Sequence, residues 1–146
     1  MVERTAVAAW QGTLFEGKGT VSTGTTGVLK DQPVTWAART AEPEGMTSPE
    51  ELIAAAHAAC YAMALSNVLA QNETPAETLE ISATVGFGPK TGGGMEVKHS
   101  RLKVVGTVPG LNAQQFSELA SKGESGCPVS NALRNNVEIT VEAELA

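Results

Sequence analysis

The alternation of hydrophobic and polar positions changes its period twice along the chain, which separates a strand-rich first third, a long helix and a mixed second half. In the first third, short runs of β-branched and small apolar residues are interrupted by turn residues, a pattern typical of strands joined by tight reversals. This pattern predicts a β-meander over residues 1–46, with strands at 2–10, 19–22, 28–29 and 34–38.

The clearest predicted element is a long helix over residues 48–71. Ser48 supplies a capping hydroxyl and a proline follows at the first helical position. Glu50 and Glu51 then place negative charge in the first turn, where the helix dipole favours it. From residue 52 to 65, alanine and larger apolar residues cover every face, and a helix that is apolar all round is buried all round. One domain of this size has difficulty enclosing such a helix, so we expect a second subunit to cover it.

The second half, residues 76–146, reads as two strands, two helices and a closing strand. The strands are predicted at 78–87, 95–108 and 137–145, and the helices start near 112 and 127. A chain of 146 residues is long enough for one domain with its own core, so we expect a single domain over residues 1–146.

Charge and composition exclude several kinds of partner. Ten Lys and Arg stand against sixteen Asp and Glu, and the resulting net charge of -6 disfavours binding to nucleic acid or to an anionic membrane surface. No long uninterrupted apolar run suggests a spanning helix, and the first residues do not resemble a secretory signal. We therefore expect a cytoplasmic protein. In that reducing compartment its two cysteines are either packed thiols or a redox pair.

Cys60 and Cys127 are the candidate redox groups. Cys60 lies within the alanine-rich helix, where the alternative is a small buried hydrophobe without chemistry. Cys127 precedes a proline at a predicted helix start, which would leave it accessible and near the positive end of the dipole; the alternative is a weak helix cap. Taken together, a buried thiol and an exposed thiol suit attack by the first and resolution by the second.

Arg39 is the candidate activator of a thiolate, since arginine is scarce and this one ends an apolar stretch. The alternative is an exposed charge at a strand end. A buried Arg39 needs a carboxylate partner, and Glu50 could supply it because Glu51 has the task of completing a capping box with Ser48. Glu50 and Cys60 are ten residues apart on one helix, about 15 Å along the axis, so they could share a site only if Glu50 serves the Cys60 of another chain.

Residues 47–60 and 126–130, together with 17–22, resemble the OsmC/Ohr family of osmotically inducible and organic-hydroperoxide-resistance proteins. The resemblance implies an α+β fold, an intertwined homodimer with two long central helices packed between β-sheets. It also implies thiol-dependent reduction of organic hydroperoxides, with hydrogen peroxide as a further candidate substrate. No cofactor and no metal is implied.

Carried over to this chain, the resemblance makes Cys60 the peroxidatic cysteine and Cys127 the resolving one, joined in a disulfide during the cycle. It makes Arg39 and Glu50 the pair that activates the thiolate from the other subunit. The reductant implied is an external dithiol, either a dihydrolipoyl protein or a small dithiol. His57 and Arg39 are typical of the OsmC branch, since the Ohr branch usually has tyrosine in place of His57 and an arginine in the segment 17–19.

Two other kinds of function remain open at this point. A zinc site could combine His57, His99, Cys60 and Cys127, although their spacing matches no compact zinc motif. Alternatively, the same fold could be a non-catalytic redox sensor, or it could bind an apolar ligand beside Tyr61, Met63 and Phe87.

Overall fold

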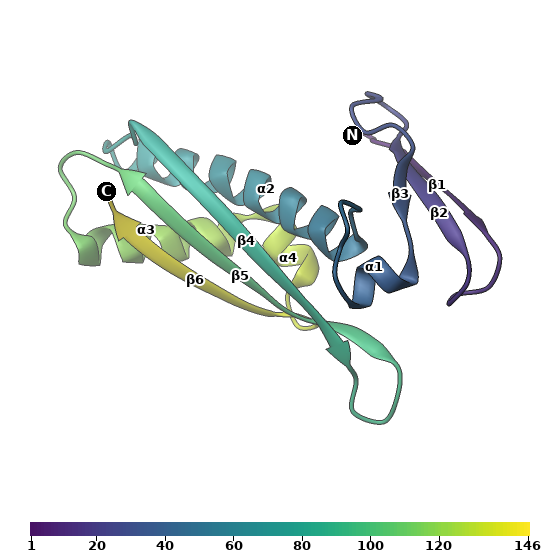
Figure 1. Ribbon diagram of the computed structural model, residues 1–146. Coiled ribbons are helices and arrows are strands. Elements are labelled where there is room, and N and C mark those ends of the chain that lie inside the picture. Colours follow the sequence, from purple (N-terminus) through teal and green to yellow (C-terminus); the bar gives the residue numbers. More distant parts are fainter. The chain divides into compact units, whose positions relative to one another are not determined.

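The computed structural model describes residues 1–146 and contains six strands and four helices (Figure 1). They form two compact units, Met1–Leu52 and Ile53–Ala146, and each unit is described by itself. That the two units act as one domain stays a prediction.

The first unit contains a three-stranded antiparallel sheet in the order β1-β2-β3, followed by a short helix. Its elements are β1 (Ala6–Gln11), β2 (Lys18–Thr23), β3 (Gln32–Val34) and α1 (Trp36–Thr40). The strand predicted at 34–38 is wrong beyond Val34. The Thr35 hydroxyl accepts a hydrogen bond from the Ala38 N–H at 3.1 Å and so caps α1. A capping threonine before a run of alanines starts a helix here, even though the residues themselves also suit a strand.

The second unit is built on a sheet in the order β4-β5-β6. β4 is antiparallel to β5 and β6 is parallel to it, because α3 and α4 intervene before the last strand. The elements are α2 (Pro49–Gln71, whose first turn belongs to the first unit), β4 (Thr78–Pro89), β5 (Met95–Thr107), α3 (Ala113–Gly126), α4 (Pro128–Leu133) and β6 (Glu138–Leu145).

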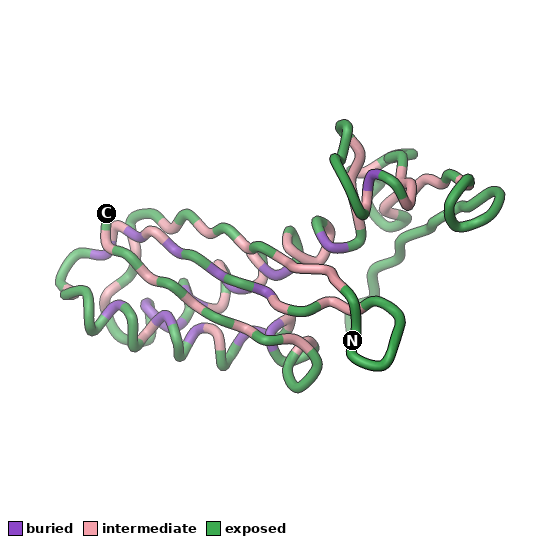
Figure 2. The backbone as a smooth tube through the Cα atoms, turned by 60° about the horizontal axis from the view of Figure 1, so that its bottom comes forward, coloured by how far each residue is buried: buried purple, intermediate pink, exposed green.

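The core of the second unit lies between one face of this sheet and the helices α2 and α3 (Figures 1 and 2). Every second residue of β5 faces inward over residues 100–106, as the period of a strand requires. The core side chains come from α2, β5, α3 and the segments beside them: Tyr61, Leu65, Leu69, Leu102, Val104, Val108, Phe116, Ala120 and Cys127.

One side of α2 contributes to this core and another side is exposed. Tyr61, Leu65 and Leu69 are fully buried, whereas the Met63 side chain is 69% exposed. The helix has a mean hydropathy of 1.6 and is long enough to cross a membrane by length and composition alone, a test that the core helix of a soluble protein also passes. Its buried residues show that it is the core helix of this unit.

The start of α2 is capped differently from the predicted capping box. The Ser48 hydroxyl accepts from the Glu51 N–H at 3.1 Å, which is the expected first half. The Glu51 carboxylate, however, accepts from the Thr47 hydroxyl at 2.6 Å. Glu51 is therefore occupied at the surface by a different partner from the one expected, and Glu50 is still the acid left for another task.

Candidate active site

Cys60 and Cys127 lie together in the second unit. Cys60 is in the middle of α2, and Cys127 is the single residue between α3 and α4. Both are free thiols, and they are near enough to interact with each other. Cys127 is fully buried and Cys60 is half-buried, so the expected exposures are reversed. The Cys127 side chain lies in the core, although its neighbours Gly126 and Pro128 are exposed.

Cys127 occupies the N-cap position of α4. Its side chain makes no capping hydrogen bond to α4, which begins with Pro128 at the first helical position. The position agrees with the alternative of a weak helix cap, because the Cys127 thiol contributes no hydrogen bond to the helix start. Cys127 belongs instead to the buried core cluster, and Cys60 packs against that cluster.

The surroundings of Cys60 within one chain favour the neutral thiol. Burial raises its pKa above the ordinary value, and the neighbouring Cys127 thiol raises the pKa further. The backbone N–H of Val129 acts in the opposite direction, because a donor to the sulfur stabilises the thiolate. No cation contributes to the Cys60 pKa in this chain. A reactive thiolate at Cys60 therefore needs a positive charge in addition to what the second unit supplies.

A positive charge with a fixed orientation is present in the first unit. Arg39 of α1 binds the Glu50 carboxylate side-on, with Nη2 2.7 Å from Oε1 and Nε 3.1 Å from Oε2. Glu50 is only 7% exposed, and the Arg39 guanidinium also lies over the Trp36 ring, 5.8 Å from its centroid. The expected ion pair is thus observed. A bidentate pair of this kind fixes the plane of the guanidinium.

An apolar cavity of about 400 Å³ adjoins Arg39 in the first unit. Trp36 is held in its wall by an edge-to-face contact with Phe15 at 6.0 Å between ring centroids. Two tryptophans and the aliphatic residues beside them leave Arg39 as the charged group of the lining, which is Trp10, Leu14, Val34, Thr35, Trp36, Arg39, Thr47 and Pro49. The cavity can hold an apolar group with a polar head beside the guanidinium.

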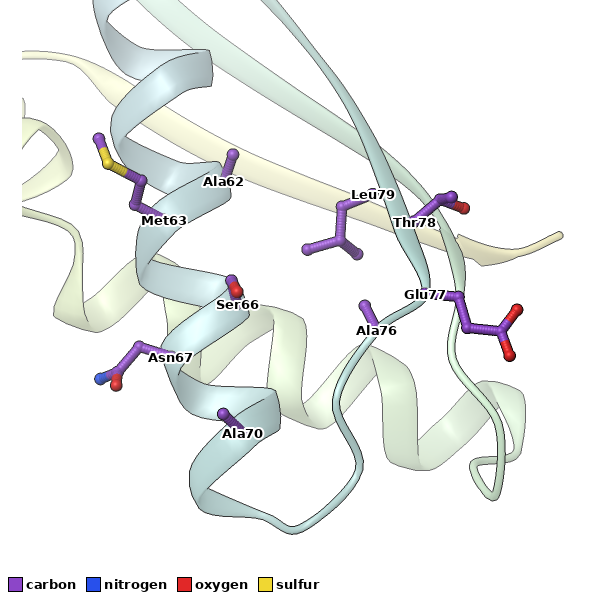
Figure 3. Close-up of a pocket in the computed structure, with 9 residues that line it drawn as sticks. All are labelled: Ala62, Met63, Ser66, Asn67, Ala70, Ala76, Glu77, Thr78 and Leu79. Atoms are coloured by element: carbon purple, nitrogen blue, oxygen red, sulfur yellow. The ribbon is translucent and has the colours of Figure 1, made fainter.

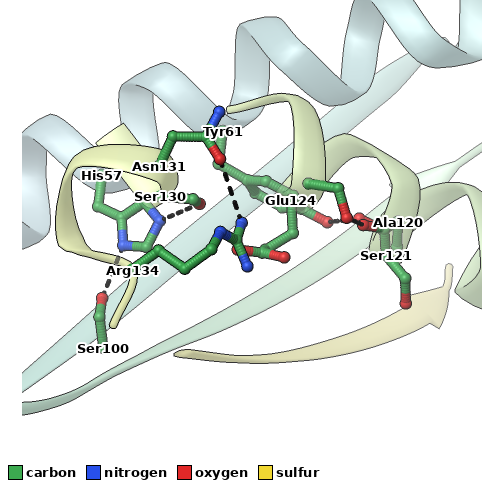
Figure 4. A network of polar contacts seen from close by, with 10 residues as sticks. His57, Tyr61, Ser100, Ala120, Ser121, Glu124, Ser130, Asn131 and Arg134 are labelled. Atoms are coloured by element: carbon green, nitrogen blue, oxygen red, sulfur yellow. Dashed lines mark hydrogen bonds and ion pairs between the residues drawn. The ribbon is translucent and has the colours of Figure 1, made fainter. Parts of the chain in front are cut away.

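His57 has both ring nitrogens occupied inside the second unit. Nδ1 is 2.7 Å from the Ser100 hydroxyl of β5, and Nε2 is 2.8 Å from the Ser130 hydroxyl of α4. All three side chains are fully buried, and Figure 4 shows the ring suspended between the two serines. Burial lowers the pKa of His57, and the charge of Glu124 partly offsets this effect.

Glu124 also acts electrostatically on Tyr61. The Tyr61 hydroxyl donates to the Ala120 carbonyl at 3.1 Å, and its pKa is raised by burial, by Glu124 and by Cys127. Glu124 itself accepts from Arg134 at 2.7 Å (Figure 4). Tyr61 is therefore a core residue that keeps its proton.

These contacts bear on the two other functions considered above. Both nitrogens of His57 are bound by serines and the His99 ring packs against Gly86, so neither histidine is arranged to join the cysteines around zinc. No group of three metal-binding side chains is found in the chain. Tyr61 is fully buried and has no exposed surface with which to line the expected apolar pocket.

A different cavity, of about 660 Å³, opens between α2 and the start of β4 (Figure 3). Of the three residues expected to line a ligand pocket, only Met63 borders it. Leu79 points toward the helix from the strand side, and the lining is Ala62, Met63, Ser66, Asn67, Ala70, Ala76, Glu77, Thr78 and Leu79. Glu77 is the only ionisable side chain of this lining, and neither cysteine borders the cavity.

Sequence reasoning missed the two serines that bind His57. Ser100 could have been found from its position on β5, because it lies two residues before Leu102 and four before Val104 and therefore faces the same side as these core residues. A serine at a core position needs a polar partner. Ser130 carries no comparable signal, because α4 has only six residues and too few turns to define a face.

Comparison with known proteins identifies the class to which this fold and thiol pair belong. A family model described as OsmC-like protein matches residues 42–142. Peroxiredoxin OsmC of Escherichia coli (strain K12) is 40% identical over 144 residues, which cover 99% of this chain and 97% of that protein. The organic hydroperoxide resistance protein of Xanthomonas axonopodis pv. citri (strain 306) is 37% identical over 97 residues, 65% of each chain.

Among solved structures, the organic hydroperoxide resistance protein OhrB of Bacillus subtilis superposes with a TM-score of 0.76 at 28% identity. The match covers 96% of this chain and 98% of that one. The chain therefore belongs to the OsmC-like family and has its α+β fold, which confirms the family and the α+β fold implied by residues 17–22, 47–60 and 126–130. The intertwined homodimer stays a prediction.

Proposed function

We propose that this chain is a thiol-dependent peroxidase that reduces organic hydroperoxides, with Cys60 as the attacking thiol and Cys127 as the resolving thiol. The observation that carries the proposal is the contact between two free thiols in a chain that is 40% identical to a peroxiredoxin over nearly its whole length. The protein acts in the cytoplasm as a homodimer.

In the first step the Cys60 thiolate attacks the terminal oxygen of the hydroperoxide. An S–O bond forms and the O–O bond breaks, which gives a Cys60 sulfenic acid and an alkoxide that takes up a proton to become the alcohol. The Val129 N–H already stabilises negative charge on this sulfur. The remaining stabilisation must come from a cation.

In the second step the Cys127 thiol attacks the Cys60 sulfenic acid, so that a disulfide forms and water leaves. Both sulfurs belong to one unit, and no large rearrangement is needed to bring the two segments together. An external dithiol then reduces the disulfide by exchange, is itself oxidised to a disulfide, and returns both cysteines to thiols. A dihydrolipoyl protein or a small dithiol fits this step.

The cation is Arg39, oriented by Glu50, and it acts on the Cys60 of the other subunit. Glu50 and Cys60 are ten residues apart on α2, about 15 Å along the helix axis, which is too far for one active site in one chain. The guanidinium would lower the pKa of the Cys60 thiol and donate hydrogen bonds to the peroxide oxygens. The apolar cavity beside Arg39 would then receive the organic part of the substrate.

The exposed side of α2 supports the dimer. Ala55, Ala59 and Met63 recur at helical spacing and are exposed in the single chain, although most residues of this helix are apolar. Exposed apolar stripes of this kind are typical of subunit interfaces. A second copy that covers the stripe would also bring its own Arg39 and Glu50 to the assembly.

The test is steady-state turnover of cumene hydroperoxide with dithiothreitol as the dithiol. Cys60→Ser should abolish turnover, because no other free thiol has the attacking role. Cys127→Ser should still consume one equivalent of hydroperoxide per chain and then stop at a Cys60 sulfenic acid, detectable with dimedone by mass spectrometry. Unchanged turnover in Cys60→Ser would overturn the proposal, and a single stoichiometric oxidation of the unmodified protein would identify a redox sensor.

A further inference from the structure

His57 and Ser130, which are joined by a hydrogen bond, are each three residues from one of the two cysteines. His57 lies three residues before Cys60 on α2, and Ser130 lies three residues after Cys127, at the start of α4. Residues three apart on a helix lie on neighbouring positions of one face. The hydrogen bond between His57 and Ser130 therefore joins the same two segments as the contact between the thiols, one helical turn away from it.

The first turn of α4 has few restraints: the Val129 N–H contacts the Cys60 sulfur, the Val129 side chain packs against the core, and Ser130 binds His57. The helix has six residues, and its N-cap residue, Cys127, makes no side-chain capping hydrogen bond. A helix this short is not stable by itself. Ser130 is the buried residue of α4. Its hydroxyl bond to His57 is thus a fixed polar link between α4 and the long helix α2.

The opposite side of the His57 ring is held by the sheet. Ser100 of β5 binds Nδ1, so the ring cannot rotate about its χ2 angle without losing both hydrogen bonds inside the core (Figure 4). Leaving a buried polar group unpaired destabilises a fold. A ring fixed in this way has no nitrogen left to exchange protons with the thiols, which argues for a role in positioning.

We propose that His57, through its hydrogen bond to Ser130, is a positioning residue that holds Cys127 in line with Cys60 for disulfide formation. The inference rests on the proposed function, because it concerns only the second chemical step. Attack of the Cys127 sulfur on the Cys60 sulfenic acid requires the two sulfurs to approach to a bonding distance near 2.05 Å in a narrow range of geometries. A loosened α4 would populate that geometry less often. It would also weaken the contact of the Val129 N–H with the Cys60 sulfur, so the consumption of hydroperoxide is measured as a separate step from disulfide formation.

The first experiment compares Ser130→Ala with Ser100→Ala in a single turnover. Each variant removes one buried hydroxyl bonded to the same ring, so the two should lose similar stability by thermal unfolding. After mixing with one equivalent of cumene hydroperoxide, samples are quenched with acid, and the sulfenic acid and disulfide forms are separated by mass spectrometry. We expect Ser130→Ala to form the disulfide about tenfold more slowly, since the lost bond no longer restrains α4. Ser100→Ala should change this rate by less than about twofold, because the bond to α4 remains.

A second pair of variants makes the same comparison at His57. The amide of glutamine reaches the place of Nε2, and the shorter amide of asparagine reaches the place of Nδ1. His57→Gln therefore keeps a bond to Ser130 and should form the disulfide at nearly the original rate. His57→Asn keeps a bond only to Ser100 and should be slow. A general loss of packing would slow both variants alike, so the contrast between them is specific to positioning.

The outcomes separate this inference from the proposed function. If the unmodified chain consumes no hydroperoxide in the first phase, the proposed function is wrong. If hydroperoxide is consumed normally but Ser130→Ala and His57→Asn form the disulfide as fast as the unmodified chain, the positioning role of His57 is wrong. The same conclusion holds if Ser100→Ala is slowed as much as Ser130→Ala. Accumulation of Cys60 sulfinic acid in Ser130→Ala at excess peroxide would support the inference, because a sulfenic acid that waits longer is oxidised further.

Discussion

At the scale of single residues, the chain separates the group that reacts from the group that carries charge. The Cys60 thiol lies where burial raises its pKa, and the Arg39 guanidinium lies in a different unit with its plane fixed by Glu50. A fixed fork serves two purposes at once. In the proposed mechanism it would provide positive charge for a thiolate, and it would present N–H donors at set angles to the two peroxide oxygen atoms.

Arg39→Lys tests the geometry of the fork separately from its charge. Lysine keeps the positive charge but cannot bind Glu50 side-on, so we expect the second-order rate constant for Cys60 oxidation to fall by about a hundredfold. The measurement is the rate of sulfenic acid formation in rapid mixing with cumene hydroperoxide. Arg101→Lys on the exposed side of β5 is the matched control and should react at the original rate. Equal rates in both variants would show that charge alone is needed.

His57 makes the stability of the fold depend on pH in a defined direction. Its pKa is lowered in the folded chain, chiefly by burial, relative to the ordinary 6.5. The unfolded chain therefore binds a proton more readily than the folded chain, and the free energy of unfolding decreases as the pH falls below about 6.5. Urea unfolding between about pH 8 and pH 5 should show this decrease. His57→Gln, which has no titrating group, should show a smaller one; an identical pH profile would assign the effect to other groups.

The site residues differ in how far the sequence could reveal them. Cys60, Cys127, Arg39 and Glu50 are predicted from the sequence because each is scarce or left over in a patterned segment. The burial of Cys127 was not foreseen, because Gly126 and a proline beside it signal a turn whether the turn lies at the surface or in the core. Serines such as Ser130 are common, so only its contact with a residue 73 positions earlier gives it meaning.

At the scale of elements, the site depends on how closely α2 and α3 approach each other. Gly123 of α3 faces Leu65 of α2, and a methyl group added at Gly123 would lie 3.1 Å from the Leu65 Cα and 3.2 Å from its Cβ. These are atoms of a central helix turn and cannot move as the end of a flexible side chain can. Since α3 leads directly into Cys127, the separation of the two helices also sets the position of the resolving thiol.

Gly123→Ala should therefore destabilise the protein, although alanine is the better helix former by about 1 kcal/mol. We expect a net loss of about 1–2 kcal/mol in the free energy of unfolding, because crowding of a packed core outweighs the gain in propensity. Gly126→Ala in the last turn of the same helix is the control, since an added Cβ there meets no atom within 4 Å. It should be neutral or slightly stabilising by thermal unfolding. A stabilised Gly123→Ala would mean that the helices separate easily.

Element boundaries were predictable where local and global signals agree. The long helix starts after Ser48 as expected, because a cap, a proline and two acids all point to the same residue. Between Val34 and Thr40 the signals conflict, since Trp36 and its neighbours suit a strand but Thr35 caps a helix. The structure follows the cap, and that turn of helix is what places Arg39 beside Glu50.

At the scale of the whole molecule, a single chain contains every residue of the proposed site but cannot bring them together by itself. Glu50, which binds Arg39, and the Cys60 thiol are ten residues apart on α2, and the exposed apolar stripe of α2 has no partner surface in the single chain. A homodimer resolves both facts. Each active site would then consist of a Cys60 and Cys127 from one chain with an Arg39 and Glu50 from the other.

Mixing two inactive variants tests this arrangement directly. Cys60→Ser and Arg39→Ala should each be inactive as homodimers, because every site lacks either the thiol or the cation. In a mixed dimer, one site would combine the intact Cys60 of one chain with the intact Arg39 of the other, while the second site would lack both. Co-expression with random pairing should therefore restore about a quarter of the original activity per chain, since half of the dimers are mixed and each has one working site of two. If Arg39 served the Cys60 of its own chain, no pairing would create an intact site, and the mixture would remain as inactive as its components. Purification through two different tags would isolate the mixed dimer, in which half of the original turnover is expected.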